Sequence, residues 1–319
     1  MSSPRLRRVT NATSSPEHAD ANGAVVSHAS LSLTRDRRKI SYAQGGEDIV
    51  LLRAFAGQPT GFWIDVGANH PERDSVTRNF TSLGWRGVNV EPVESLFLEL
   101  VAARPADINL HAAVGAVSGR LVFHRNDTNL DLSSFDEALI DFYRSRGDVI
   151  TDIEVTVHTL TEICEMTGVS EPIDFVKIDT EGHELSVLQG HDFSRFPIRV
   201  LLAEVQAQDR SVVRNLLSDA GMTFVLFDGL NSWFVRNEEL ETLGQVLGSP
   251  AHAILDWYHP AVYVEMMRES ESRIEDLLGQ IEALRDDNAR LSAGSPAESA
   301  PPRPRRWTLR GHGLAFWRR

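Results

Sequence analysis

Phe62-Trp-Ile-Asp-Val-Gly-Ala-Asn69 is the stretch of sequence that decides the fold. Residues 62–66 form a short apolar run of the length of a buried strand, and Gly67 and Ala68 follow where the chain must turn. Ligands of open α/β sheets bind outside the carboxyl ends of the strands, and small residues there let the backbone approach a ligand closely. The stretch therefore predicts a first core strand followed by a ligand-binding turn.

Strand and helix patterns alternate after this stretch. Strands are expected over residues 88–91, 108–114, 119–124, 154–158, 174–179 and 199–205, with a closing antiparallel pair over 224–227 and 232–235. Helices are expected over residues 49–55, 74–83, 94–103, 160–166, 183–190 and 210–220. This alternation predicts an α/β fold with a mostly parallel sheet that is covered by helices on both faces.

The turn after the first strand differs from a dinucleotide-binding turn. Only one glycine of the G-x-G-x-x-G pattern is present, which argues against a nicotinamide-dependent oxidoreductase. Asp65 beside the turn disfavours a pyrophosphate and suits the cationic methionine end of S-adenosylmethionine (SAM). Glu91 ends the next strand, 26 residues after Asp65, where a carboxylate can accept hydrogen bonds from a ribose diol. For Glu91 alone, a solvated strand-end acid is an equally good interpretation.

Several further short sequence motifs follow one another over residues 40–206, in this order: Gln44-x-x-Glu47-Asp48, Ser75-x-Thr77, Gly84-Trp-Arg-Gly87, Val90-Glu-Pro92 and Asp174-Phe-Val-Lys-Ile-Asp-Thr-Glu-Gly-His-Glu184. With these motifs the chain resembles the FkbM-type methyltransferases. The resemblance implies a Rossmann-like class I methyltransferase fold, SAM as the methyl donor, and O-methylation of a hydroxyl on a glycan, a glycolipid or a secondary metabolite. The residues that it implies at the cofactor are Asp65, Gly67, Asn69 and Glu91, with Gln44, Glu47 and Asp48 as a lid. Ala68 is a further cofactor candidate because of its small size beside Gly67. The polar run His70-Pro71-Glu72-Arg73-Asp74 departs from the pattern.

The block after the fourth core strand holds the candidate catalytic residues. An alcohol is a weak nucleophile at neutral pH, so its methylation needs a base or a metal ion. Asp179 and Glu181 are expected to orient the acceptor hydroxyl or to bind a divalent cation, although two carboxylates make an incomplete cation site. His183 is a candidate general base. The alternative is that this block is only the polar first turn of a helix, where acids are favoured. Glu204, at the end of the fifth strand, is a weaker candidate on the acceptor side.

Composition and charge divide the chain into parts. We expect a disordered segment over residues 1–39, a methyltransferase domain over 40–250, a helix over 262–292, and a Pro-rich linker with a basic aromatic tail over 293–319. The formal net charge of −13 comprises +4 in residues 1–40, +6 in 303–319 and therefore −23 in 41–302. A body that acidic repels nucleic acids. The single cysteine, Cys164, excludes an internal disulfide and fits a reducing cytoplasm.

The C-terminal part carries a heptad pattern. Apolar residues and one asparagine alternate at intervals of three and four residues: Ile274, Leu277, Ile281, Leu284, Asn288 and Leu291. This a/d pattern favours a homodimeric coiled coil over residues 267–291, and the alternative is an amphipathic helix docked on its own domain. The basic aromatic tail suggests peripheral contact with the inner face of an anionic membrane, or no function at all. Together these features leave a second hypothesis, a scaffolding or membrane-recruited component whose methyltransferase domain is secondary or inactive.

Overall fold

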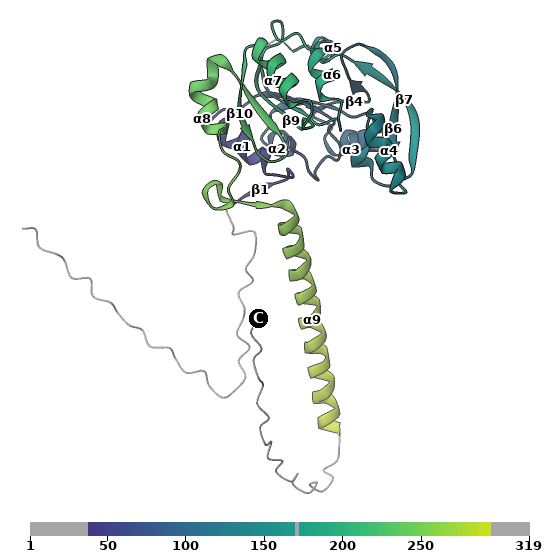
Figure 1. The fold of residues 1–319 in the computed structure, drawn as a ribbon. Helices are drawn as coiled ribbons and strands as arrows, with labels where there is room; N and C mark the ends of the chain where they lie inside the picture. The colour runs from purple at the N-terminus through teal and green to yellow at the C-terminus, as the bar shows by residue number, and fades with distance from the viewer. Residues whose placement is uncertain (1–37, 170–171, 295–319) are drawn as a thin grey trace, which may run out of the picture. The chain divides into compact units, whose positions relative to one another are not determined.

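The computed structural model describes residues 38–169 and 172–294 (Figure 1). Within these residues, the largest sheet has seven strands: β2 (Phe62–Val66), β3 (Arg86–Val90), β4 (Ile108–Leu110), β8 (Ile173–Ile178), β9 (Ile198–Ala203), β10 (Met222–Phe227) and β11 (Ser232–Arg236). Their spatial order is β10-β11-β9-β8-β2-β3-β4, and all pairs are parallel except those that β11 makes. The strand order reverses at β2, which lies between β3 and β8. Such a switch point is where open α/β sheets bind ligands.

Helices pack on both faces of this sheet because its strands are apolar on both faces. The helices within the domain are α1 (Glu47–Ala54), α2 (Arg78–Ser82), α3 (Glu94–Ala103), α5 (Leu160–Met166), α6 (Glu184–Gln189) and α7 (Arg210–Asp219). Trp63 of β2 packs in one core cluster with α1 and α2, whereas its neighbour Ile64 packs in another with α5, α6 and α7. The single cysteine, Cys164, is fully buried in the second cluster. The predicted α/β fold with a mostly parallel sheet is confirmed.

A smaller sheet lies beside the carboxyl end of β4. It contains β5 (Ala113–Val114), β7 (Ile150–His158) and β6 (Gly119–Asn126), in the order β5-β7-β6. The 3-10 turn η2 (Leu130–Leu132) and helix α4 (Glu137–Ser145) connect β6 to β7. The prediction of one strand over residues 108–114 is wrong. A tight turn, in which the amide of Ala112 donates to the carbonyl of Leu110, separates β4 from β5 and sends them to different sheets.

The helix predicted to start at residue 74 begins at Arg78. Asp74 has a left-handed backbone with φ of 56°, which is incompatible with a right-handed helix, and Thr77 takes the N-cap position. The other helices and strands that were predicted lie within a few residues of their predicted bounds, and α3 and α5 match them.

The last described part of the chain leaves the domain through short elements. These are η3 (Asn237–Glu239), the π-helical turn η4 (Leu240–Gly244), α8 (Gln245–Leu247), the π-helical turn η5 (Ala253–Trp257), β12 (Tyr258–Pro260) and α9 (Ala261–Gly294). Strand β1 (Lys39–Ser41) pairs with β12 in parallel, which joins the two ends of the domain. The helix predicted over residues 262–292 is present as α9, while its pairing with a second copy stays a prediction.

The predictions for residues 1–37 and 295–319 lie outside the described residues. Across residues 38–169 and 172–294, no helix is both long and apolar enough to cross a membrane.

Candidate active site

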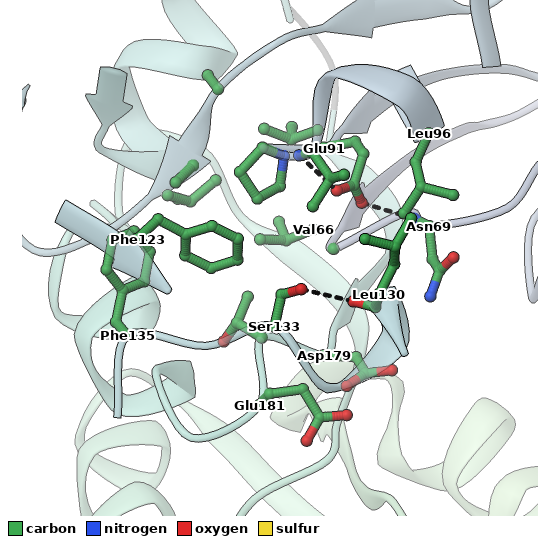
Figure 2. Close-up of a pocket in the computed structure, with 18 of the residues that line it drawn as sticks. Val66, Asn69, Glu91, Leu96, Phe123, Leu130, Ser133, Phe135, Asp179 and Glu181 are labelled. Atoms are coloured by element: carbon green, nitrogen blue, oxygen red, sulfur yellow. Dashed lines mark hydrogen bonds between the residues drawn. The ribbon is translucent and has the colours of Figure 1, made fainter. Parts of the chain in front are cut away.

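A pocket opens at the switch point of the sheet, outside the carboxyl ends of β2, β3 and β8 (Figure 2). It has about 590 Å³ of empty space, counting the part open to solvent, which is within the range of small-molecule sites. The lining residues come from the end of β2 and the turn after it, the end of β3 and the start of α3, the small sheet with the residue before it, the segment 130–135 and the loop after β8. They are Val66, Gly67, Asn69, Val90, Glu91, Pro92, Val93, Leu96, Ala112, Ala113, Val114, Phe123, Leu130, Asp131, Ser133, Phe135, Asp179, Thr180 and Glu181.

The turn after β2 is held between the two neighbouring strands. The amides of Gly67 and Ala68 both donate to the carbonyl of Val90, at 3.0 and 3.2 Å. Gly67 has a left-handed φ of 74°, and a Cβ atom there would lie 1.8 Å from the carbonyl oxygen of Asp179. Only glycine fits this position. Ala68 is buried and is not among the lining residues, so it contributes its small size to the turn and not a surface to the pocket.

Glu91 is fixed by the turn that it faces. Its two carboxylate oxygens accept hydrogen bonds from the amides of Asn69 and Val93, both at 2.8 Å (Figure 2). Burial raises the pKa of Glu91 to about 7, against the lowering effect of these two hydrogen bonds. Asn69 donates its side-chain amide to Asp131, but its Oδ1 atom is buried and has no partner within the described residues. A buried acceptor without a partner in the wall of a pocket suits a ligand that brings a donor.

Asp65 lies beneath the pocket, not in its wall. It accepts a hydrogen bond from the hydroxyl of Thr77 at 2.9 Å, and its neighbour across the sheet is Lys177 of β8. The ammonium group of Lys177 lies 3.5 Å from Asp65 Oδ1 and 3.3 Å from Asp179 Oδ2. Our sequence interpretation gave no role to Lys177. One signal was present, since the chain has only two lysines among 32 basic residues, and this one stands inside an apolar strand.

The loop after β8 brings Asp179 and Glu181 to the pocket, on the side opposite Glu91 in Figure 2. Glu184 holds this loop, because its Oε1 atom accepts hydrogen bonds from the amide and hydroxyl of Thr180 and from the amide of Gly182. Glu181 has a left-handed backbone with φ of 52°, and its carbonyl accepts a 2.5 Å hydrogen bond from the hydroxyl of Ser134. The surrounding contacts therefore hold Glu181 in a costly conformation, a pattern found at functional sites.

Burial is the main cause that raises the pKa of Glu181, to about 8, and the negative charges of Asp179, Glu204 and Glu184 add to it. Burial also raises the pKa of Glu204 to about 7. Carboxyl groups with raised pKa values near neutral pH are suited to proton transfer. This pair of glutamates, one on the loop after β8 and one directly after β9, has a chemistry that ordinary surface acids lack.

His183 lies behind the pocket wall. Its ring packs against the ring of Phe135, with 4.7 Å between centroids, and burial lowers its pKa. Its Nε2 atom is buried without a partner within the described residues, and His183 is not among the residues that line the pocket. The structure therefore brings Asp179 and Glu181 together and leaves His183 one layer away from them.

Gln44, Glu47 and Asp48 stand at the start of α1, and none of them lines the pocket. The carboxylate of Asp48 accepts hydrogen bonds from Ser41, Tyr42, Ile49 and Asn79, which leaves it engaged within the protein. The carboxyl of Glu47 binds the amide of Gly45 and the side chain of Asn231, and burial raises its pKa to about 7. Gln44 is exposed. Their role at a cofactor stays a prediction.

The apolar wall opposite the sheet was not predicted as part of the site. It consists of Phe123 from β6 and of Leu130 and Phe135 from the connection that follows. Leu130 and Phe135 stand in a stretch whose sequence shows no clear period, and Phe123 stands in the strand predicted over residues 119–124, so only the fold brings all three to the strand ends of the large sheet. Within the described residues, no group of three or more His, Cys, Asp or Glu side chains has an arrangement that could hold a metal ion.

The family model described as methyltransferase FkbM domain matches residues 65–234, which is 170 of 319 residues and just over half of the chain. The matched segment begins at Asp65 and ends in β11, so it includes the carboxyl end of β2, the strands β3 and β8, and the turn and the loop that form the pocket. A search of curated proteins found no match.

Proposed function

This chain belongs to the FkbM methyltransferase family, and we propose that it transfers a methyl group from SAM to a hydroxyl of a glycan, glycolipid or related metabolite. The observation that carries this proposal is one pocket in which the Gly67 turn, the carboxyl of Glu91 and the Asp179–Glu181 loop meet. Family membership supports methyl transfer in general. The pocket supports the cofactor, and its loop supports a hydroxyl as the acceptor.

The residues of the pocket fit the chemical groups of SAM. Glu91 stands where a carboxylate can accept hydrogen bonds from a ribose, since its oxygens retain lone pairs beyond the two bonds that they make. Leu96, Ala112 and Phe123 offer an apolar surface for a planar base. Asn69 Oδ1 is an acceptor in need of a donor, which the amino group of the methionine part provides.

The strand order of the large sheet supports a Rossmann-like fold. Numbered along the chain, its strands lie in the order 3-2-1-4-5-7-6, which differs from the doubly wound order only in the antiparallel insertion of the last strand. In that fold the ligand binds where strands 1 and 4 diverge. These are β2 and β8, whose carboxyl ends form the pocket.

Bound SAM supplies a methyl group on a positively charged sulfur, and the protein has to hold the acceptor oxygen in line with that methyl. Asp179 and Glu181 are the polar side chains at the rim that can orient a hydroxyl. Glu181 is better placed than His183 to receive its proton, because Glu181 lines the pocket and His183 does not. The raised pKa of Glu181, which burial causes first, makes its carboxylate a stronger base than an exposed one.

Calorimetric titration with SAM tests the proposal. The full chain should bind SAM, and Glu91→Gln should weaken the binding at least tenfold by removing the charge that strengthens two ribose hydrogen bonds. Glu94→Gln is the control, since Glu94 is an exposed glutamate at the start of α3. The proposal fails if the unaltered chain does not bind SAM, or if Glu91→Gln binds it as tightly as the parent.

A further inference from the structure

A second pocket lies on the far side of the loop that follows β8. It is bounded by the ends of β8 and β9 and by the turn between β10 and β11, and we call it the β9 pocket. Its lining residues are Glu181, Gly182, Glu204, Val205, Gln206, Arg210, Gly229 and Leu230. Glu181 is the residue that lines both this pocket and the one at the switch point. The two pockets therefore share a wall at one residue, Glu181.

Methyl transfer requires two adjoining binding spaces, one for the cofactor and one for the acceptor. The acceptor oxygen must approach the methyl carbon from the side opposite the sulfur, so the acceptor needs a space of its own that meets the cofactor space at the reacting atoms. We infer that the β9 pocket binds the methyl acceptor, and that this acceptor is polyhydroxylated with no phosphate or carboxylate beside the reacting hydroxyl. The inference rests on the proposed function and adds the place and the class of the acceptor.

The contacts of the loop after β8 indicate that the β9 pocket has a fixed shape. Gly182 has a left-handed φ of 100°, and a Cβ atom there would lie 2.6 Å from the side-chain nitrogen of Gln206. Glycine thus lets the amide of Gln206 stand directly against the loop that carries Glu181. The hydrogen bonds that Glu184 and Ser134 make to the loop hold this arrangement before any ligand arrives. A wall built in this way is preorganised, which lowers the entropic cost of binding.

The charges of the β9 pocket select against anions. Glu181 and Glu204 face it, and Arg210 is the one cation among its lining residues. The Nε atom of Arg210 donates to the carbonyl of Val205 at 3.1 Å, and its guanidinium stacks on the ring of Phe227 at 4.1 Å from the centroid. In their ionised form these two carboxyl groups repel a phosphate or a carboxylate, and in either form they exchange hydrogen bonds with neighbouring hydroxyls. Gln206 adds an amide that both donates and accepts.

In the transfer step, the carboxylate of Glu181 is the proton acceptor. A bond forms between the acceptor oxygen and the methyl carbon, the bond between that carbon and sulfur breaks, and its electron pair stays on sulfur. The proton of the hydroxyl passes to the carboxylate of Glu181. Asp179, Glu184 and Glu204 are the negative groups that act on Glu181, and Lys177 is the positive one. A positively charged cofactor on the other side of the wall favours the ionised carboxylate that this step requires.

The first test is a transfer assay with the full chain, isotope-labelled SAM and four pools of defined saccharides: neutral sugars, amino sugars, uronic acids and sugar phosphates. Label should enter the neutral or amino pools and stay out of the two anionic pools. Label in an anionic pool overturns the inference. So does the absence of label from every pool while calorimetry shows that SAM binds. Failure to bind SAM at all would instead reject the proposed function.

The second test uses variants of the β9 pocket with the saccharide that accepts label. Glu204→Gln and Gln206→Ala should each lower kcat/KM for this saccharide at least tenfold and change the SAM dissociation constant less than twofold. Glu238→Gln, an exposed glutamate on η3, is the control and should change neither value. Calorimetric titration of the same saccharide into the chain without SAM gives a readout independent of turnover. Unchanged saccharide affinity and unchanged kcat/KM in both pocket variants would place the acceptor elsewhere.

Discussion

The ammonium group of Lys177 lies 2.9 Å from the carbonyl oxygen of Gly67, and this contact ties the turn after β2 to β8. The same group lies within 3.5 Å of Asp65 and Asp179, so one cation serves two carboxylates and a backbone carbonyl at the base of the pocket. Burial alone would lower the pKa of Lys177, but Asp179 and Asp65 together raise it above its usual value. Lys177 is therefore a permanent positive charge in this site.

Lys177→Met should destabilise the chain by about 3–5 kcal/mol, because it leaves the buried carboxylate of Asp65 without its compensating charge. Urea denaturation followed by circular dichroism measures the free energy of unfolding. The chain has one other lysine, the exposed Lys39, and Lys39→Met is the matched control with an expected change below about 0.5 kcal/mol. Equal stability of the two variants would mean that the contacts of Lys177 contribute little.

Gly67→Ala should abolish SAM binding or weaken it more than tenfold, since a methyl group there would meet the carbonyl of Asp179 and push the turn away from β8. Gly84→Ala is the control, because Gly84 shares the left-handed φ but has no atom within 4 Å of the added Cβ position. It should lose about 1 kcal/mol of stability from backbone strain and bind SAM normally. Calorimetric titration checks both, and normal binding by Gly67→Ala would contradict the description of the turn.

The buried carboxyl of Glu47 makes the stability of the chain depend on pH. Its pKa is raised from 4.5 to about 7, chiefly by burial, so the folded chain keeps a proton that the unfolded chain releases within this range. The folded state binds more protons there, and the contribution of Glu47 to stability must fall as pH rises from about 4.5 to about 7. The whole fall amounts to about 3 kcal/mol at 1.36 kcal/mol per pKa unit.

Glu47→Gln removes this proton linkage. The difference in unfolding free energy between the parent and Glu47→Gln should therefore shift against the parent from pH 5 to pH 8 in urea denaturation. Glu94→Gln, which changes an exposed glutamate at the same first position of a helix, shows the effect of simply losing a surface carboxyl. A parent–variant difference for Glu47→Gln that stays constant with pH, or moves the other way, would refute this account.

We propose that α9 pairs with a second copy of the chain. The apolar residues of its heptad pattern are exposed: Ile274, Leu277, Ile281, Leu284 and Leu291. Isoleucine at a positions, leucine at d positions and one asparagine at an a position favour a parallel dimer, in which Asn288 pairs with its own copy. The chain should sediment as a dimer in analytical ultracentrifugation, and Leu284→Asp should make it monomeric. Ala283→Asp introduces the same charge outside the a and d positions and should remain dimeric. A monomeric parent chain would refute the pairing.

Most of the fold was predictable because it rests on local signals. The short, mostly apolar runs of β2 and β8 and the helical faces of α3 and α5 can each be read from a single segment of sequence. The division of residues 108–114 between two sheets was not predictable from periodicity, because both halves are apolar and only their partners differ. Pairing between distant strands is a property of the whole chain.

The candidate site was predictable where it follows the strand ends. Asn69, Glu91, Asp179 and Glu181 all line the pocket, since each stands within three residues of the carboxyl end of a core strand. Lys177 was missed because the role of a lysine inside an apolar strand becomes clear only from the strand register, which places Lys177 beside Asp65. The aromatic wall was missed for the same reason: Phe123 and Phe135 reach the pocket through tertiary packing.

The parallel pairing of β1 with β12 has a practical consequence for shortening this protein. Strand β1, which precedes the Gln44–Asp48 segment, pairs with residues 258–260, and these residues directly precede α9. A truncation that removes α9 but ends before Tyr258 would release β1 and loosen the first turn of α1. A truncation that ends after Pro260 keeps β1 paired with β12. The choice of boundary therefore decides whether a shortened chain reports the loss of the helix alone or also damage to the domain.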